Sequence, residues 1–567
     1  MATTHHVTRG DELAAPLDLI LTSTESPLNR MMPHASWAKV AGGLVSRPGT
    51  VARRTAGLAA ELASIAAGIS TRTPTRRDRR FADPAWRHNP FLRRILQSYL
   101  ATAETAQSLL ADVDLDWRDR ERVTFALDNV IDAFAPSNVP VVSPEFWKAV
   151  VETGGGNVLA GLRNLLGDLS TTPRVPSMIE RNAYRVGKTL AVSPGAVVLR
   201  TEVFELIQYR PTTDQVHAVP LVLVPPVINK FYVADLAPGR SMIEYFVRQG
   251  HQVFAISWRN PDARHREWDF DTYGQAILDA MAATRRVTGA EQTHVLSICS
   301  GGMLAAMTLA HLARIGELDR VASLGVAVSV IDNSKAGLTM ALADEKIARA
   351  AVQRSQAKGY LDGRTLAEVF AWLRPNDLIW SYWVNNYLQG RKPTAFDVLF
   401  WNADTTRMAA GLHRDFVDVA LHNSLTEAGR VTFLGSPVDL KAVTSPAYVV
   451  AGISDHISPW QSCYRTTQLL GGDVRFVLSS SGHVASMVNP PGNVKSTYQV
   501  TPKDAAGNPA DPERWLTTAS SEQGSWWPDY AAFLAERGGP LIEAPGELGG
   551  GGLKPMEAAP GTYVLDS

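Results

Sequence analysis

Short, mostly apolar runs alternate with amphipathic stretches along the second half of the chain. Each run is about as long as a strand, and continuous apolar runs of this kind are typical of strands buried on both faces of a sheet. Residues 301–313, which directly follow one run, have the composition of a helix. Strands and helices in alternation predict an α/β fold with a mostly parallel sheet. The runs are Pro220–Val224, Gln252–Trp258, His294–Ile298, Tyr448–Ile453 and Val474–Ser479.

The first half of the chain has the spacing of helices instead. Apolar side chains recur at helical intervals from Leu92 to Ala103, and the alanine-rich segment Val51–Ile69 predicts another helix. We therefore expect a mainly helical N-terminal domain over residues 1–190. A cluster of arginines lies between and within these segments. It is either a solvated linker or a contact surface for an anionic or amphiphilic partner. Its members are Arg72, Arg76, Arg77, Arg79, Arg80, Arg87, Arg93 and Arg94.

Two stretches of the second half do not follow the strand and helix alternation. Residues 330–440 are rich in tryptophan and tyrosine, including Trp380, Trp383 and Trp401, and predict a cap inserted into an α/β domain that spans residues 191–540. After residue 540 the chain contains four consecutive glycines, Gly549 to Gly552. We expect the segment 541–567 to be a flexible tail.

Composition narrows the class of protein. The formal net charge is −1 over 567 residues, and the pI is about 6.9, which argues against a nucleic-acid-binding protein. Two cysteines form no disulfide framework, so a reducing compartment is expected. The N-terminus lacks the pattern of a secretory signal. No apolar run reaches the length of a membrane span, so we expect no transmembrane segment.

One strand-turn-helix segment carries a candidate nucleophile, Cys299. The residues Ser297-Ile-Cys299-Ser-Gly301 resemble the G-x-S-x-G nucleophile elbow of the α/β-hydrolase fold, with cysteine in place of the central serine. Ser297 stands where the motif has its first glycine, and since the turn requires small residues we expect serine to be tolerated. A cysteine at a strand end is often only a small apolar residue, so the motif alone leaves both interpretations open.

Two later strands end in residues that complete a catalytic triad. Asp455 follows the run 448–453, and His483 follows the run 474–479. The order nucleophile, acid, base is that of the elbow enzymes. His483 is then the group that accepts the thiol proton, and the start of the helix after Cys299 favours the thiolate. These three residues favour a catalytic cysteine.

Backbone groups near the elbow are candidates for the oxyanion hole. We expect the N–H of Ser300 to supply one donor and the N–H of Val227, in the loop after the strand 220–224, to supply the other. His456 is either structural support for Asp455 or a site residue, and Cys463 is expected to pack in the interior. The sequence has no dinucleotide or P-loop fingerprint and no metal-ligand cluster, so no metal or redox cofactor is expected.

Several long segments resemble the polyhydroxyalkanoate synthases, and the resemblance covers roughly residues 80–535. It implies single-component enzymes of the class I/II type, with an α/β-hydrolase core. The segments are Pro225-Pro-Val-Ile-Asn-Lys-Phe-Tyr, His251-Gln-Val-Phe-Ala-Ile-Ser-Trp-Arg-Asn-Pro-Asp, Leu373-Arg-Pro-Asn-Asp-Leu, Leu399-Phe-Trp-Asn-Ala-Asp, Asp455-His-Ile-Ser-Pro-Trp and Ser481-Gly-His-Val-Ala-Ser-Met-Val-Asn-Pro-Pro.

The resemblance implies polymerisation of (R)-3-hydroxyacyl-CoA into a polyester, with release of CoA. Cys299 then carries the acyl group as a thioester, His483 activates the thiol, and Asp455 either orients His483 or activates the 3-hydroxyl group of the incoming unit. The CoA thioester is the substrate, and no cofactor is implied. Arg374 is a candidate CoA contact or a structural ion pair, while Trp401 is a cap or interface aromatic or a binding residue, and His456 is a third candidate near the substrate.

The resemblance also implies partners and a location. These are a homodimer formed through the cap, attachment to polyester granules in the cytoplasm, and contact with the granule or a partner through the helical N-terminal domain. A polyester depolymerase or thioesterase on the same core is the alternative enzyme. A granule coat protein without catalysis is a further alternative, although a coat protein would need no Cys–Asp–His set.

Overall fold

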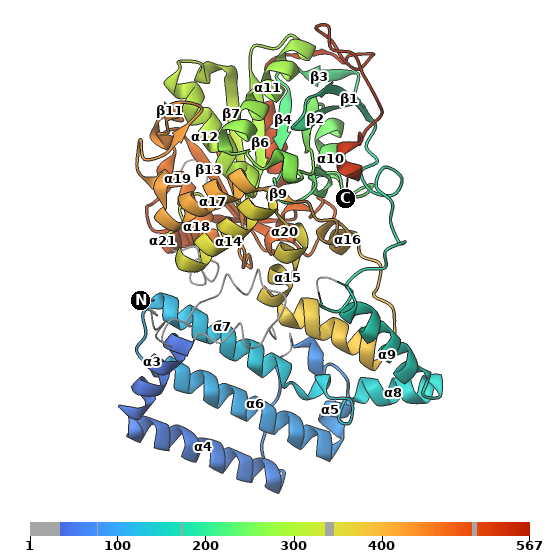
Figure 1. Cartoon of the computed structure of the whole chain (residues 1–567), viewed down its shortest axis with the longest axis vertical. Helices are drawn as coiled ribbons and strands as arrows, with labels where there is room; N and C mark the ends of the chain where they lie inside the picture. The colour runs from blue at the N-terminus through green and yellow to red at the C-terminus, as the bar shows by residue number, and fades with distance from the viewer. Residues whose placement is uncertain (1–33, 76–77, 172–173, 335–344, 502–506, 567) are drawn as a thin grey trace, which may run out of the picture. The chain divides into compact units, whose positions relative to one another are not determined.

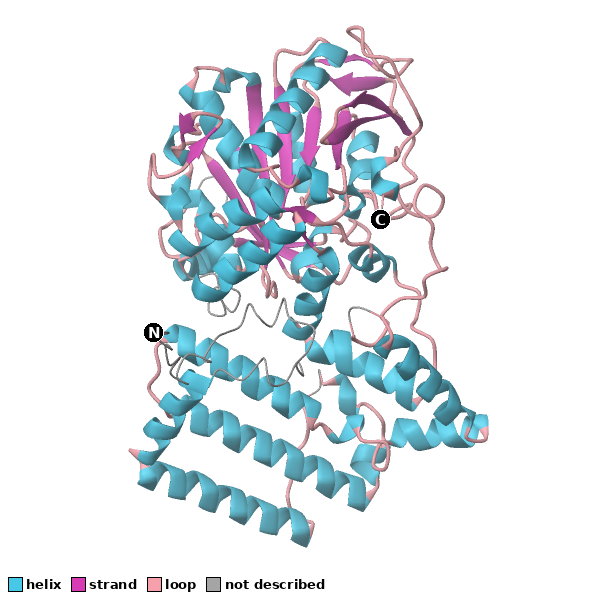
Figure 2. Cartoon of the chain, viewed as in Figure 1, coloured by secondary structure: helices cyan, strands magenta, loops and turns pink. Residues whose placement is uncertain are grey.

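The computed structural model describes residues 34–75, 78–171, 174–334, 345–501 and 507–566. These residues form two compact units. The described residues of the first unit lie within Met1–Glu180, Ala341–Ala351 and Arg364–Ala395, and those of the second lie within Arg181–Met340, Val352–Gly363 and Phe396–Ser567. The second unit contains the large sheet, and the first is built from helices (Figures 1 and 2).

Within the described residues, ten strands form one sheet in the order β1-β2-β5-β4-β6-β7-β12-β13-β14-β15. The central strands from β5 to β13 are parallel, and antiparallel strands extend both edges. This is the expected α/β fold with a mostly parallel sheet. The strands are β1 (Gly195–Arg200), β2 (Phe204–Tyr209), β4 (Leu221–Val224), β5 (Val253–Trp258), β6 (Thr293–Ile298), β7 (Val321–Ala327), β12 (Ala447–Gly452), β13 (Val474–Ser479), β14 (Thr497–Val500) and β15 (Ser520–Gln523).

The five strands predicted from apolar runs are β4, β5, β6, β12 and β13, each displaced by no more than a residue or so. The prediction missed β7, which lies between β6 and β12 and pairs with both in parallel. Its sequence, Val-Ala-Ser-Leu-Gly-Val-Ala, has a glycine in its interior and weak strand character. Gly325 is required there because a Cβ atom would lie 2.5 Å from the hydroxyl oxygen of Tyr530.

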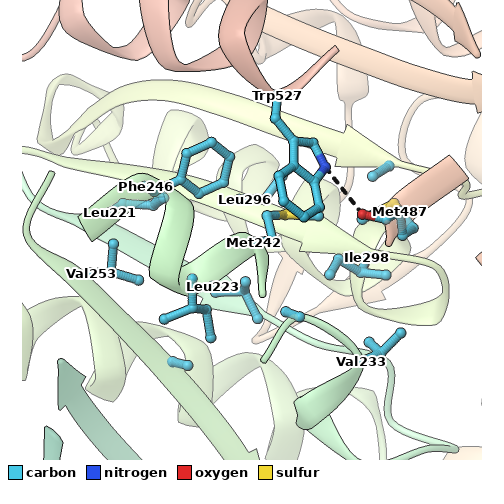
Figure 3. Close-up of a cluster of buried hydrophobic side chains, with 14 of the residues drawn as sticks. Leu221, Leu223, Val233, Met242, Phe246, Val253, Leu296, Ile298, Met487 and Trp527 are labelled. Carbon is cyan, nitrogen blue, oxygen red and sulfur yellow. Dashed lines mark hydrogen bonds between the residues drawn. The ribbon is translucent and has the colours of Figure 1, made fainter. Parts of the chain in front are cut away.

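Helices cover both faces of the sheet, because successive side chains of each strand point to opposite sides. On one face Leu223 and Leu296 pack with Phe246 of α10 (Met242–Arg248) and with Trp527 of α22 (Trp527–Ala535), as Figure 3 shows. The Trp527 indole nitrogen donates to the carbonyl oxygen of Met487 at 3.1 Å. On the other face, α11 (Phe270–Thr288) and α12 (Ser300–Arg314) contact β4 and β6.

The first unit contains the helices expected from the apolar spacing. The segment 51–69 lies in α4 (Pro48–Ala67), and the apolar positions from 92 to 103 lie in α6 (Pro90–Ala111). The described helices up to Glu180 are α3 (His34–Val45), α4, η1 (Arg79–Phe81), α5 (Ala85–His88), α6, α7 (Trp117–Ala133), η2 (Pro136–Asn138), α8 (Pro144–Thr153) and α9 (Gly156–Leu169). None of the helices that the structure describes is long and apolar enough to cross a membrane.

Part of the arginine cluster forms ion pairs inside the first unit. Arg80 binds Asp78 and Asp132, each at 2.9 Å. Arg72 binds Glu61 and Glu104. These contacts favour a structural role for both arginines over a free contact surface. Arg76 and Arg77 lie outside the described residues.

The predicted cap, residues 330–440, is divided between the two units. Of its described residues, 345–351 and 364–395 belong to the first unit, with the π-helical segments η6 (Asn376–Trp380) and η7 (Trp383–Leu388). The helices α16 (Asp397–Ala403) and α17 (Ala410–His422) belong to the second unit. The division arises because η7 packs closely against α9 of the first unit. A Cβ atom on Gly161 of α9 would lie 2.0 Å from the Tyr387 carbonyl oxygen of η7.

The segment after residue 540, expected to be a flexible tail, is instead packed against the second unit. Its strand β16 (Leu541–Glu543) pairs with β3 (Gln215–His217), and the N–H of Val197 donates to the Glu557 carbonyl oxygen at 2.9 Å. The physical reason is the open edge of β1, whose unpaired backbone groups need partners. Buried Glu205 holds the same segment by accepting from the N–H groups of Thr562 and Tyr563 at 3.0 and 3.1 Å.

Candidate active site

Cys299 lies at a sharp turn between β6 and α12. Its backbone has φ 51° and ψ −123°, a region that is unfavourable for a residue with a side chain. The Cys299 N–H donates to the Ala327 carbonyl oxygen of β7 at 2.9 Å, which holds the turn. A Cβ atom on Gly301 would lie 2.6 Å from the Pro225 carbonyl oxygen, so a glycine is required there. This is the geometry of a nucleophile elbow, with a half-buried cysteine at its tip.

The structure accounts for serine at position 297, where the elbow motif has glycine. Ser297 is fully buried in β6, and its hydroxyl donates to the Gly325 carbonyl oxygen of β7 at 2.7 Å. The side chain therefore points toward the neighbouring strand, where its polar group has a partner. A serine fits without displacing the turn that carries Cys299.

The loops after β12 and β13 bring Asp455 and His483 together. Nδ1 of His483 lies 2.7 Å from Oδ2 of Asp455. The other carboxylate oxygen of Asp455 accepts the backbone N–H groups of Ile457 and Ser458 at 2.9 and 2.8 Å. The Asp455 side chain is completely enclosed. Because each oxygen has a donor, the carboxylate is held in one orientation and remains a good acceptor for His483.

The charge on His483 depends on its two neighbours. Burial opposes the imidazolium, but the charges of Asp455 and Cys299 and the hydrogen bonds of His483 with both side chains outweigh it. Together they raise the pKa of His483 from its ordinary value of 6.5 to about 10. Cys299 and His483 are thus in contact, and the site favours the imidazolium form of His483 at neutral pH.

Gly452, the last residue of β12, allows the two loops to approach. A Cβ atom there would lie 2.5 Å from the Ser486 hydroxyl oxygen and 2.6 Å from the Ser481 carbonyl oxygen. Both atoms belong to the segment around His483. The sequence prediction did not single out this glycine, although a glycine at the end of a buried strand is a signal of close backbone approach.

Val227 and Ser300 lie next to each other beside the elbow. The N–H of Val227 donates to the Ser300 hydroxyl oxygen at 3.1 Å. Ser300 is the first residue of α12, so its own N–H is among those that lack a partner within the helix. The indole nitrogen of Trp258 donates to the Pro225 carbonyl oxygen at 3.2 Å and holds the start of the loop. The residues that carry the two candidate oxyanion donors, Val227 and Ser300, therefore lie side by side next to Cys299.

The remaining predicted residues differ in position. His456 directly follows Asp455 in the same loop. Trp401 is buried, and its indole nitrogen donates to the Lys230 carbonyl oxygen at 2.8 Å, which is a packing arrangement. Arg374 belongs to the first unit, where it forms an ion pair with Asp377. The structure does not bring Arg374 and the triad together in one unit.

Cys463 is buried in α18 (Trp460–Tyr464), and its Sγ lies 3.6 Å from the Ser458 carbonyl oxygen. Burial raises the pKa of its thiol well above the ordinary value, with smaller contributions from Asp455 and Cys299. The group therefore stays protonated, as packing requires. Among the described residues, no group of three or more histidine, cysteine, aspartate or glutamate side chains is arranged to hold a metal ion.

Comparison with known proteins places the chain among polyester polymerases. Residues 77–246 match the family model for the N-terminus of poly-beta-hydroxybutyrate polymerase (PhaC), and residues 229–490 match that for the alpha/beta hydrolase fold. The chain is 44% identical over 520 residues to poly(3-hydroxyalkanoate) polymerase 1 of Ectopseudomonas oleovorans, covering 92% of each chain. It is 39% identical over 512 residues to the poly(3-hydroxyalkanoate) polymerase subunit PhaC of Cupriavidus necator, covering 88% of this chain and 85% of that one.

Solved structures that align with part of the chain include a monoacylglycerol lipase from Paleococcus ferrophilus. It is 12% identical, with a TM-score of 0.31, and the match covers 59% of this chain and 100% of the lipase. An esterase from Exiguobacterium antarcticum is 13% identical, with a TM-score of 0.31, and the match covers 51% of this chain and 93% of the esterase.

Proposed function

The chain belongs to the poly(3-hydroxyalkanoate) polymerase family, and we propose that it builds its polyester through a covalent thioester on Cys299. It is an acyltransferase that polymerises hydroxyacyl-CoA into polyhydroxyalkanoate. The relatives do not favour the depolymerase or thioesterase alternative. The observation that carries the proposal is the 2.7 Å contact of His483 with Asp455, combined with the position of Cys299 at the elbow.

Acylation of the enzyme begins with attack by Cys299 on the (R)-3-hydroxyacyl-CoA substrate. The thiol proton passes to His483, and Sγ then attacks the thioester carbonyl carbon and forms a tetrahedral intermediate. The bond from that carbon to the CoA sulfur then breaks, and His483 gives its proton to the departing sulfur. Free CoA leaves, and the acyl group remains on Cys299. The raised pKa of His483 supports this step, because the imidazolium is present at neutral pH.

The oxyanion of the tetrahedral intermediate needs donors that are already in place. We propose the backbone N–H groups of Ser300 and Val227, as their position beside the elbow supports. In the structure the Ser300 hydroxyl accepts from Val227. That hydroxyl must therefore rotate away, or share the donor, when the substrate oxygen arrives.

Elongation transfers the acyl group from sulfur to oxygen. The 3-hydroxyl oxygen of the chain end or of the next unit attacks the carbonyl carbon of the Cys299 thioester. Its proton passes to His483, an ester bond forms, and the thiolate returns. We propose that Asp455 orients His483 and does not itself take the hydroxyl proton, because both its oxygens already accept N–H groups and its side chain is enclosed.

An exposed apolar surface in the first unit supports a granule contact. Trp147 and Val151 of α8 and Leu159, Leu162 and Leu166 of α9 are all exposed. The spacing of the three leucines places them on one face of α9, while Asn157 of the same helix donates to the Leu388 carbonyl oxygen of η7 at 2.8 Å. We propose that this α8–α9 surface contacts the apolar polyester, since a surface patch of this kind marks an interaction site.

Two further proposals rest on the family resemblance. One is that Arg374 contacts CoA, and the other is that the chain works as a homodimer on the granule surface without a second kind of subunit. Light scattering of the purified chain gives its mass and tests the dimer. Polymerisation by the purified chain alone tests the single-component reading.

Purified protein incubated with 3-hydroxybutyryl-CoA tests the reaction. We expect polymer and free CoA, with an acyl adduct on Cys299 that mass spectrometry of rapidly quenched peptides detects. Cys299→Ala is expected to abolish both the adduct and the polymer, and Cys463→Ala, which changes a buried cysteine beside the site, is the matched control that keeps both. Free hydroxy acid without polymer would support the hydrolase instead. Polymer from Cys299→Ala would refute the covalent cysteine.

A further inference from the structure

The loop after β4 carries Val227 but has little regular structure of its own. Between β4 and α10 its one helical segment is the short 3₁₀ helix η3 (Phe231–Val233). At its start the loop is held against the elbow by the Val227–Ser300 and Pro225–Trp258 hydrogen bonds. Its far end must be held by other contacts if the Val227 N–H is to keep one position.

Those contacts come from the end of α16, where four interactions join two short segments. Nζ of Lys230 lies 2.7 Å from Oδ1 of Asp404. The Tyr232 hydroxyl donates to Oδ2 of Asp404 at 2.8 Å, and the Trp401 indole donates to the Lys230 carbonyl oxygen at 2.8 Å. A backbone bridge between Asn229 and Thr405 is the fourth.

The interior position of this group makes its contacts strong. The Lys230 side chain is 5% exposed, and Asp404 is the carboxylate paired with it. Burial, together with Asp404, raises the pKa of Tyr232, so its hydroxyl remains a donor. A buried ammonium without its carboxylate is costly, so the pair and the segments that carry it move together.

We propose that Asp404 is a positioning residue for the reaction. Through Lys230 and Tyr232 it fixes the loop that carries the Val227 oxyanion donor. We call Lys230, Tyr232, Trp401 and Asp404 the Asp404 clamp. The inference rests on the proposed oxyanion role of Val227 and also gives Trp401 a role, that of holding the Lys230 backbone. The clamp acts where the chain re-enters the second unit, a few residues after Phe396.

The test separates stabilisation of the oxyanion from integrity of the nucleophile. Acyl transfer needs the oxyanion hole, whereas alkylation of Cys299 by iodoacetamide is a displacement at a saturated carbon and forms no oxyanion. For Asp404→Asn we expect kcat with 3-hydroxybutyryl-CoA to fall by about tenfold to a hundredfold. The KM and the rate of Cys299 alkylation are expected to stay near those of the unaltered protein.

The other end of α16 supplies the control. Asp397 begins the helix and binds Arg240, with Oδ1 at 2.6 Å from its guanidinium. Asp397→Asn therefore removes a similar ion pair at the other end of the same helix, and no clamp residue takes part in that pair. We expect its kcat to stay within about twofold of the unaltered protein, because Arg240 lies 13 residues after Val227, beyond the segment that the clamp holds, and loss of its ion pair is mainly a stability effect.

Tyr232→Phe covers the case in which Asp404→Asn does not fold, since it removes one hydrogen bond and no charge. It is expected to lower kcat by about threefold to tenfold, again without a change in alkylation, because a small displacement of a donor is felt in the transition state. An unchanged kcat in both clamp variants overturns the proposal. So does a fall in alkylation parallel to kcat, or an equal loss in Asp397→Asn.

The outcome at the clamp is distinguishable from failure of the thioester mechanism. If Cys299→Ala still makes polymer, the thioester mechanism fails whatever the clamp variants do. If Cys299→Ala is inactive while both clamp variants keep the kcat of the unaltered protein, the mechanism stands and the clamp is refuted.

Discussion

The imidazole of His483 donates through Nδ1 to Oδ2 of Asp455 at 2.7 Å, and the carboxylate that accepts it has 0% of its side chain exposed. This contact makes the largest of the contributions that raise the pKa of His483. With Cys299 on the other side, it raises the pKa of His483 to about 10. The imidazolium that protonates the departing CoA sulfur is therefore present at neutral pH and is lost only in strongly alkaline solution.

The pH dependence of acyl transfer follows from this shift. We expect the alkaline limb of kcat to fall near pH 10, where His483 loses its proton. Since the pKa is raised on folding, its stabilising contribution is complete below about pH 6.5 and disappears as the pH rises through about 10. Asp455→Asn removes the largest contribution that raises this pKa. The alkaline limb should move to lower pH, and kcat should fall by roughly ten-thousandfold, as for other triads that lose their carboxylate.

The measurement is kcat as a function of pH. The release of CoA is monitored with a thiol reagent that works over the whole pH range. Denaturant unfolding at pH 7 and pH 10 reports the stability contribution. An alkaline limb at the same pH in Asp455→Asn would contradict the role of Asp455.

Replacement of Ser297 by glycine tests how the elbow tolerates serine. The Ser297 hydroxyl donates to the Gly325 carbonyl oxygen, and its side chain is not part of the proposed chemistry. For Ser297→Gly we expect kcat within about threefold and a loss of about 1–2 kcal/mol in the free energy of unfolding, from the lost hydrogen bond and the added chain freedom. Urea unfolding and CoA release measure the two quantities. Ser297→Ala removes the hydrogen bond without adding the chain freedom of glycine, so it separates the two contributions to stability. A large fall in the kcat of Ser297→Gly would show that Ser297 affects the geometry of the turn.

The close approach at Gly452 predicts a variant with impaired catalysis. In Gly452→Ala the new methyl group meets the Ser486 hydroxyl and the Ser481 carbonyl, so the segment carrying His483 must move. A displacement of this kind is expected to lower kcat by about a hundredfold. Gly492→Ala is the matched control, because a Cβ atom there has no heavy atom within 4 Å. Equal activity of the two variants would refute the role of Gly452.

The attachment of the chain's last segment predicts a stability effect far from the catalytic residues. Buried Glu205 accepts from Arg200 and from the backbone of Thr562 and Tyr563. Glu205→Ala leaves these donors unpaired and is expected to lower the free energy of unfolding by about 3 kcal/mol or more. The exposed Glu543→Ala should change it by no more than about 0.5 kcal/mol. Thermal and urea unfolding measure both, and equal values would show that the segment adds no stability.

Arg374 provides a test of CoA recognition. Its guanidinium is about half exposed and forms an ion pair with Asp377, an arrangement that contributes little to stability. If it also binds a CoA phosphate, Arg374→Ala should raise KM by about tenfold with little change in kcat, since a charge-assisted contact contributes about 1.5 kcal/mol or more. Asp377→Ala is the control, because it breaks the same ion pair and leaves the guanidinium. Equal effects in both variants would assign Arg374 to structure alone.

Much of the catalytic constellation follows from local sequence. Strand-forming runs end at Cys299, Asp455 and His483 in the order that an elbow enzyme requires, and parallel strands present their carboxyl ends at one edge of a sheet. These strand patterns and motif residues depend only on neighbours in the chain, so the sequence alone is enough to identify them. The family, the fold class and the type of reaction were predicted from them and from the quoted segments, and the comparisons confirm all three.

The rest depended on contacts between residues far apart in the chain. No local pattern shows that the Ser297 hydroxyl meets Gly325, that Asp404 meets Lys230, or that the segment after residue 540 covers the edge of β1. The glycines Gly549 to Gly552 predicted flexibility, yet all four adopt positive φ in an ordered loop. Composition describes what a segment is able to do alone, whereas its conformation is decided by the unsatisfied backbone and side-chain groups that folding places beside it.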